Sequence, residues 1–297
     1  MRKNLMFVGA FAVTLMLAAC GSGVQRKTSE KYSAAEGEQA DKVMKYYNAS
    51  LALLKNLVVE KDVNTVLGYM EQNGDAPILT AVVPPAFSQK DSASVVNPGT
   101  YFNEETRRNL KQNFMQLFQV RKQFYANFNR YLSSLKAKDK SAADKLLPVN
   151  YRLSVEMAEY KENILDMLSS FTEEAQKVLL NDNPMKEQIL AMNRMSATMQ
   201  SILQLCMRKP SPDMAWLDMK MMKLVIQLDI AKRLPTVEGH PREMKTFRDF
   251  LAHAEAFMKE VQHIKSQGSY TVDEMETLGT YGPVSYTHLR AHETLAN

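Results

Sequence analysis

The feature that most constrains this chain is a pair of long segments in which apolar residues recur every three or four positions. The first segment carries Leu110, Phe114, Leu117, Phe124, Phe128, Tyr131 and Leu135. The second carries Leu153, Met157, Tyr160, Ile164, Met167, Phe171, Ala175 and Val178. Because this spacing places the apolar side chains on one face of an α-helix, each segment predicts a long helix that packs against another helix.

Four more segments show the same period, and together they predict an all-α fold. They run from about Glu38 to Met70, from Ile189 to Cys206, from Leu217 to Leu228 and from Phe247 to Val261. Glycine and clustered prolines separate the segments, since proline cannot continue a helix. The resulting fold is an elongated antiparallel bundle of about six long helices in one domain, with one long proline-rich loop from Asp75 to Asn103.

The first 20 residues have the features of a bacterial export signal. Arg2 and Lys3 form a positive start, and residues 5–17 are apolar but too short for a comfortable transmembrane helix. Small residues then lead directly to Cys20, in a pattern that resembles the lipobox of diacylglyceryl-modified lipoproteins. The resemblance implies that Cys20 is acylated, that the lipid anchors the protein to a membrane, and that residues 21–37 form a flexible tether.

The residues after the lipobox bear on the destination of the protein. No acidic residue follows Cys20 directly, which by resemblance to the sorting rules of such lipoproteins implies retention at the outer membrane. The acidic run that resembles a surface-export signal is also missing from this stretch. We therefore expect a lipid-anchored protein of the outer membrane that faces the periplasm.

Charge and cysteine content restrict the classes of partner and of covalent cross-link. Lys and Arg number 37 against 33 Asp and Glu, and removal of the signal peptide and the last residues brings the two closer still. A nucleic-acid partner is therefore not expected. Apart from Cys20 the only thiol is that of Cys206, so stability must come from packing rather than from an internal disulfide.

The sequence lacks the usual motifs of catalysis, with no glycine-rich phosphate loop, paired-Cys zinc site, nucleophile elbow or HExxH pattern. We therefore expect neither enzyme activity nor a cofactor or metal site. Methionine is nevertheless frequent, and the thioethers of Met195 and Met199 are of the kind that binds Cu(I). Both residues also lie on an apolar stripe, so core packing is the favoured interpretation and a copper or small-ligand carrier the alternative.

We make a separate prediction for each of three further residues. Arg121 interrupts the first apolar segment, where it could contact an anionic ligand. We expect it instead at the edge of the helix pair, near a carboxylate or water, because a buried unpaired charge costs on the order of several kcal/mol. Asp91-Ser92-Ala93, within the long loop, resembles the O-glycosylation motif of certain bacterial envelope proteins, which implies modification of Ser92. Trp216 begins an apolar stripe and is expected in the core.

The layout as a whole resembles the YiiG-type lipoproteins, a helical family of unknown function. The resemblance rests on the lipobox, the polar tether, the patch Tyr46-Tyr47-Asn48 in the opening helix and the long helices beyond it. It covers residues 38–282 and implies a helical fold without implying an activity. We therefore expect a non-catalytic lipoprotein that binds an envelope protein along a helical face.

The last residues, 283–297, form a separate segment. The run from Val284 to Thr294 resembles a translated sequencing adapter, so we expect this tail to be foreign to the protein. A capping box at Thr271 and Glu274 opens a helix that stops without a normal end, which predicts that the helical domain is truncated there. The spaced pair of histidines at 288 and 292 falls in the tail and predicts no metal site.

Overall fold

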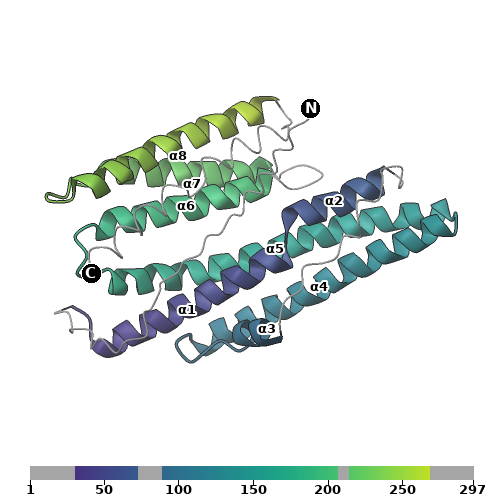
Figure 1. Ribbon diagram of the computed structural model, residues 1–297, viewed down its shortest axis with the longest axis horizontal. Coiled ribbons are helices and arrows are strands. Elements are labelled where there is room, and N and C mark those ends of the chain that lie inside the picture. Colours follow the sequence, from purple (N-terminus) through teal and green to yellow (C-terminus); the bar gives the residue numbers. More distant parts are fainter. Residues whose placement is uncertain (1–30, 73–88, 207–213, 268–297) are drawn as a thin grey trace, which may run out of the picture.

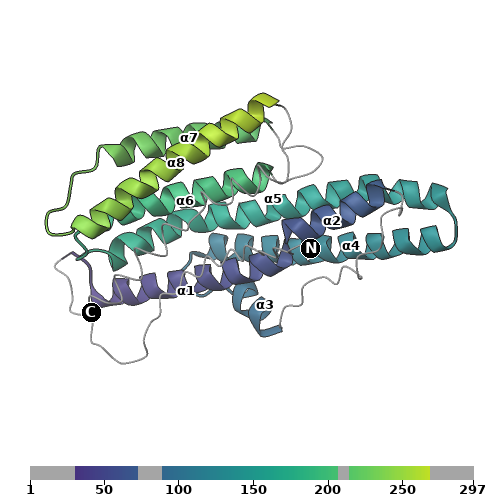
Figure 2. The ribbon, with the colours of Figure 1, turned by 45° about the horizontal axis from the view of Figure 1, so that its top comes forward.

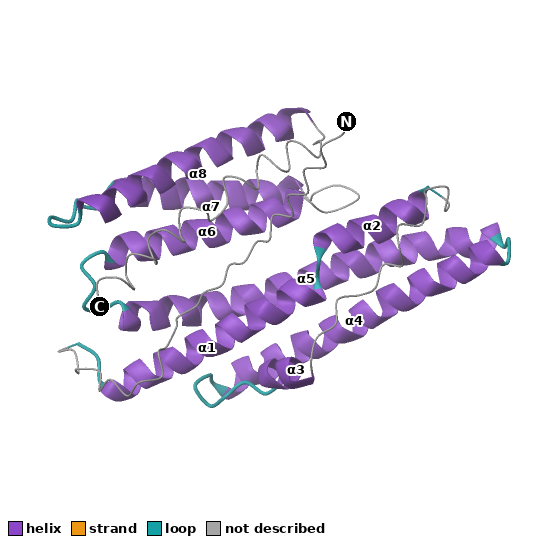
Figure 3. Cartoon of the chain, viewed as in Figure 1, coloured by secondary structure: helices purple, strands orange, loops and turns teal. Residues whose placement is uncertain are grey.

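The computed structural model describes residues 31–72, 89–206 and 214–267 (Figure 1). These ranges contain helices and no strand, which confirms the predicted all-α fold (Figure 3). The helices are α1 (Ala34–Leu57), α2 (Glu60–Glu71), α3 (Gln89–Val96), α4 (Glu104–Lys136), α5 (Lys140–Leu179), α6 (Lys186–Cys206), α7 (Met214–Lys232) and α8 (Pro241–Gln267). Within the described ranges, no helix is both long enough and apolar enough to cross a bilayer.

The longest helix, α5, connects the two parts of the molecule. Its 40 residues correspond to a length of about 60 Å, and Figure 1 shows it along most of the long axis. It packs against α1, α2 and α4, and near its C-terminal end against α6. In Figures 1 and 2, α6, α7 and α8 form a second layer beside one end of α5.

Polar side chains fix the starts of three helices. At α1, Ser33 and Glu36 form a capping box, and at α4 the side chain of Asn103 accepts a hydrogen bond from the Thr106 amide at 2.8 Å. Asp139 caps α5 in the same way. These caps satisfy amide groups that have no partner inside the helix.

The buried hydrophobic side chains form two clusters. The N-terminal cluster combines residues from α1 to α5, among them Phe114 and Met157. The C-terminal cluster combines residues from α6, α7 and α8, among them Met195, Leu224 and Phe257. The structure thus has two packed clusters inside the segment for which the sequence favoured one domain.

The two faces of α5 explain why the clusters stay separate. Met157 and Leu168 pack in the N-terminal cluster, whereas Glu162, Glu173 and Gln176 lie on the opposite side of the helix, as its periodicity requires. Burying carboxylates in an apolar core is costly unless they are paired. Polar contacts made by these side chains join the second layer to α5.

The first helical segment contains a break, so the prediction of one helix reaching Met70 is wrong. α1 ends at Leu57 and α2 begins at Glu60, and Val58 between them has φ −126° and ψ 88°. Neither glycine nor proline occurs at the break, and apolar residues continue on both sides of it. The sequence therefore gives no local signal for it; the partners that stabilise it come from α4 and α5.

The segment expected to be one long loop contains the short helix α3. Tyr46 of α1 donates a hydrogen bond to the carbonyl of Val95 in α3 at 2.7 Å. Phe102, after α3, packs edge-on against Tyr46 with ring centroids 5.2 Å apart. The latter part of this segment is thus packed against α1, while residues 73–88 lie outside the described ranges.

Candidate functional site

The predicted site residues fall in different parts of the chain. Cys20, the capping pair at 271 and 274, and the tail 283–297 lie outside the described residues, so the acylation of Cys20 stays a prediction. The described ranges include the other candidates, namely Ser92, Arg121, Met195, Met199 and Trp216. The structure divides these five between its two parts, with Ser92 and Arg121 on α3 and α4 and with Met195, Met199 and Trp216 on α6 and α7.

Arg121 is buried beside the break between α1 and α2, which corrects the expectation that it lies at an edge. Only 9% of its surface is exposed. Its Nε donates a hydrogen bond to the carbonyl oxygen of Leu57 at 3.0 Å, and its guanidinium carbon lies 5.2 Å from the centre of the Tyr125 ring. A carboxylate or water was expected as the hydrogen-bond partner, and the Leu57 carbonyl at the end of α1 is a partner that the sequence did not indicate.

Lys161 of α5 makes a related contact at the same break. Its Nζ donates to the carbonyl of Val58 at 3.3 Å and lies 3.8 Å from Oε1 of Glu60, with both side chains nearly buried. The carbonyls at the C-terminal end of a helix carry partial negative charge, which a cation stabilises. Arg121 and Lys161 therefore both stabilise the C-terminal end of α1 at the break.

The surroundings of Arg121 favour a structural role. Burial lowers the pKa of its guanidinium, and the neighbouring Tyr125 and Asp62 oppose that effect. Burial likewise raises the pKa of Tyr125, and the charge of Arg121 lowers it. Because its Nε is bound to Leu57, stabilising the break accounts for Arg121 better than contact with an anionic ligand, which stays a prediction.

Ser92 lies in the helix α3 rather than in an extended loop. Its side chain is partly exposed and interacts with other residues of the chain. O-glycosylation at this position stays a prediction.

The methionines considered as metal ligands lie inside the C-terminal cluster. Met192 and Met195 are fully buried and Met199 is 3% exposed, and they pack with apolar residues of α7 and α8. The favoured interpretation of this stripe as core is therefore consistent with the structure. In the described part of the chain, no group of three or more His, Cys, Asp or Glu residues is arranged to hold a metal ion.

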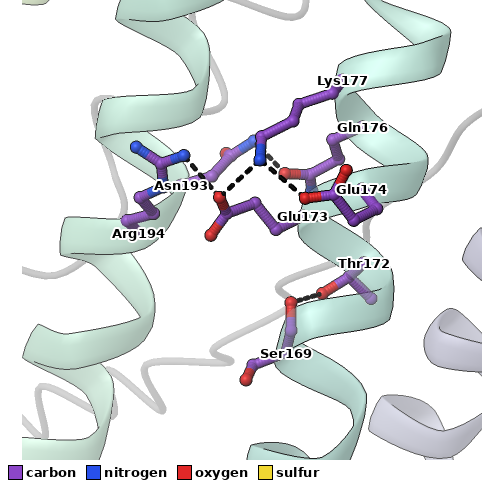
Figure 4. A network of polar contacts seen from close by, with 8 residues as sticks. All are labelled: Ser169, Thr172, Glu173, Glu174, Gln176, Lys177, Asn193 and Arg194. Carbon is purple, nitrogen blue, oxygen red and sulfur yellow. Dashed lines mark hydrogen bonds and ion pairs between the residues drawn. The ribbon is translucent and has the colours of Figure 1, made fainter.

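One polar network joins α5 to α6 (Figure 4). Arg194 Nη2 lies 2.6 Å from Glu173 Oε1, and Lys177 Nζ lies 3.0 Å from the same oxygen. Asn193 also donates a hydrogen bond to Gln176 at 3.2 Å. Mainly because of the hydrogen bond from Arg194, the pKa of Glu173 is below its ordinary value of 4.5.

A second, more deeply buried contact joins α5 to α7. Lys220 Nζ lies 2.9 Å from Glu162 Oε1, and the two side chains are only 9% and 15% exposed. Ser201 of α6 donates a hydrogen bond to the same carboxylate oxygen at 3.2 Å. Glu162 thus receives polar contacts from both α6 and α7.

The expectation that Trp216 belongs to the core is wrong. Its side chain is 43% exposed, and Lys220 Nζ lies 5.6 Å from the ring centroid. The buried stripe of α7 begins instead at Leu217, and one residue along a helix changes the direction of a side chain by about 100°. The apolar pattern of α7 did not distinguish the two directions because both contain apolar residues.

A row of exposed apolar side chains lies opposite the buried stripe of α7. We call it the outer α7 face; its centre is formed by Met219, Met222, Ile226 and Ile230, and its edges by Met214, Trp216 and Val225. The four central side chains are 53% to 67% exposed. A helix that is hydrophobic on all sides is normally buried, so this face is the most unusual surface in the described part of the protein.

Residues 34–182 match the family described as a domain of unknown function, DUF6845. Residues 184–284 match the family described as the DUF3829-like, C-terminal domain. The end of the first match and the start of the second fall between α5 and α6, which is also where the two hydrophobic clusters meet.

Two solved structures from Bacteroides resemble most of this chain. An alpha helical protein from Bacteroides fragilis is 54% identical, with a TM-score of 0.81, over 86% of this chain and 100% of that one. An uncharacterized DUF3829-like protein from Bacteroides thetaiotaomicron is 42% identical, with a TM-score of 0.75, over 84% of this chain and 98% of that one. Among curated proteins, none matches this chain. The resemblance to YiiG-type lipoproteins stays a prediction.

Proposed function

Because the chain belongs to the DUF6845 family and carries a DUF3829-like C-terminal domain, neither with an assigned activity, we propose its function from its own residues. It is a lipid-anchored envelope protein that acts without catalysis, by binding a protein partner. It resides at the outer membrane and faces the periplasm. The observation that carries the binding role is the outer α7 face.

The anchor follows from the beginning of the sequence. A positive start, an apolar stretch and small residues precede Cys20, and the first described helix begins soon afterwards, at Ala34. The intervening polar residues separate the lipid from the bundle. This arrangement attaches a folded helical protein to a membrane without any part of the fold having to enter it.

The binding role follows from the physics of exposed apolar surface. Water disfavours contiguous apolar patches, and soluble proteins keep such patches small unless they form a contact site. Met222 is 67% exposed and Ile226 is 55% exposed, although α7 contributes a second, fully packed stripe to the core. The outer α7 face therefore fits a protein that uses a helical surface for association.

The copper-carrier alternative receives less support. Thioethers bind Cu(I) when several of them converge on an accessible position. Here Met192, Met195 and Met199 are buried among apolar side chains, so binding would require the core to open. Replacing Met195 and Met199 together by Leu keeps the volume and removes both thioethers. If the alternative were correct, this variant would lose Cu(I) binding that the wild type shows in titration.

Two measurements test the proposed function in cells. Metabolic labelling with a fatty-acid probe is expected to label the wild type and not Cys20→Ser, which should also leave the membrane fraction. Covalent cross-linking followed by mass analysis is expected to give an adduct that disappears when Met222→Glu and Ile226→Glu are combined. Gln262→Glu, at an exposed position of α8, is the control and should keep it. An unlabelled wild type, or adducts identical in all variants, would contradict the proposal.

A further inference from the structure

The outer α7 face points away from the core, on the side of the helix opposite the one that packs there. The buried residues of α7 are Leu217, Met221, Leu224, Leu228 and Ala231. Counting at about 100° per residue, Ile226 lies almost directly opposite them, with Met222 and Ile230 one turn before and after it. The exposed apolar surface is therefore a continuous stripe with Ile226 at its middle.

The size of this stripe is appropriate for a stable protein contact. The four central side chains and Trp216 are 43% to 67% exposed, and for large side chains of about 150 to 250 Å² this amounts to roughly 500 Å². The largest apolar patch of an ordinary monomer is about 300 to 600 Å². A stable interface covers about 800 Å² on each partner, so the stripe alone supplies most of what a dimer needs.

The charges around the stripe permit contact between identical surfaces. Three of the charged residues at its borders are already paired within the chain, as Asp218 with Lys265, Asp229 with Arg233, and Lys232 with Glu255. A border of one sign would repel a second copy and would favour a partner of the opposite sign. A border that carries charges of both signs does neither, and the methionines and tryptophan of the stripe are residue types enriched in interfaces.

We propose that the outer α7 face is the contact surface between two copies of this chain. This inference rests on the proposed binding role and names the partner as an identical protein. In a contact with twofold symmetry the same patch is used by both copies, and a residue near the symmetry axis meets its own counterpart. Ile226, at the middle of the stripe, is the residue closest to that axis.

Disulfide cross-linking of the full, lipidated chain in its membrane tests the proposal. Ile226→Cys is expected to form a covalent dimer of twice the chain mass under mild oxidation. Gln262→Cys, exposed on α8 of the same layer, is the matched control and should remain monomeric. The native Cys206 is 1% exposed, so it should not contribute. Cross-linking at 262 equal to that at 226 would show a random contact and overturn the proposal.

Sedimentation of the detergent-solubilised chain provides a second measurement. The wild type is expected to have twice the mass of the Met222→Glu and Ile226→Glu double variant, while the two melt at similar temperatures because both residues are exposed. A monomeric wild type overturns the proposal. If Ile226→Cys instead forms an adduct with a different protein, the second-copy inference fails and the proposed binding role survives. If the face forms no contact of any kind, both fail.

Discussion

Lys220 of α7 and Glu162 of α5 form an ion pair with 2.9 Å between Nζ and Oε1, and it is one of the contacts that join the two hydrophobic clusters. Both side chains are nearly buried, so the pairing offsets part of the cost of burying each charge. The more exposed pair of Arg194 with Glu173 joins α5 to α6 nearby. The relative placement of the two layers therefore depends on charged groups that the apolar pattern does not include.

We predict that Lys220→Met destabilises the protein by about 3 to 5 kcal/mol, because it removes a closely placed cation from the nearly buried Glu162 carboxylate. Adding Glu162→Leu should recover part of this loss, since the buried charge is then removed. Urea unfolding of both single variants and of the double variant measures the coupling. Lys232→Met, which breaks a partly exposed pair with Glu255, is the control and should cost no more than about 1 kcal/mol. If the losses of unfolding free energy in Lys220→Met and Glu162→Leu simply added up in the double variant, the prediction would be wrong.

At the break between α1 and α2, we predict that Lys161→Met is more harmful than Arg121→Met. Loss of Arg121 leaves the Leu57 carbonyl without its donor, at a cost of about 1 to 3 kcal/mol. Loss of Lys161 affects the Val58 carbonyl and also leaves Glu60 nearly buried without a cation, at a cost of about 3 to 5 kcal/mol.

Chemical unfolding provides the free energies for this comparison, and limited proteolysis reports opening of the break. Lys122→Met removes an exposed charge from the neighbouring position in α4 and should change stability by less than about 0.5 kcal/mol. If Arg121→Met behaves like this control, the hydrogen bond to Leu57 does not stabilise the break.

The long helices could be predicted because their signal is local. The apolar spacing in α4 and α5 depends only on neighbours three and four residues away. The break after Leu57 could not be predicted, because the cationic side chains that stabilise it come from far along the chain. Arg121 is 64 residues from Leu57, and Lys161 is 103 residues from Val58.

The surfaces of the helices were harder to predict than their positions. Glu162 and Glu173 are visible in the sequence, but a carboxylate on a helix ordinarily faces water, so nothing distinguished them as contacts between layers. α7 is apolar on both sides, which left the direction of Trp216 undetermined. Acylation of Cys20 and modification of Ser92 depend on enzymes that recognise short motifs, and the fold does not test them.

The pH dependence of stability should reveal the network in Figure 4. The folded pKa of Glu173 is below its ordinary value of 4.5, first because of the hydrogen bond from Arg194 and also because of Lys177. Its stabilisation is therefore complete above about pH 4.5 and is lost as the pH falls through the folded pKa. The pair is partly exposed, so we expect no more than about 1 kcal/mol. Glu173→Gln should be less stable than the wild type at pH 7, and the difference should shrink at pH 3.

The contribution of Cys206 to stability should change in the opposite direction, because it should decrease as the pH rises. Burial raises the pKa of its thiol to about 11 from an ordinary value of 9.0, so the folded state holds the proton that the unfolded state releases. The contribution of this thiol to stability is therefore complete below about pH 9 and decreases as the pH rises toward 11. Cys206→Ala does not titrate, so the stability advantage of the wild type over this variant should decrease over that interval.

The same burial should protect the thiol from chemical modification, since the thiolate is the reactive species. At pH 8 we expect Cys206 in the acylated native protein to react with an aromatic disulfide reagent on the order of 100 times more slowly than in denaturant. Gln262→Cys provides an exposed thiol on α8, outside the outer α7 face, as a positive control. Equal rates at 206 and 262 in the folded protein would show that the core around α6 opens readily, and would also reopen the copper-carrier alternative for Met195 and Met199.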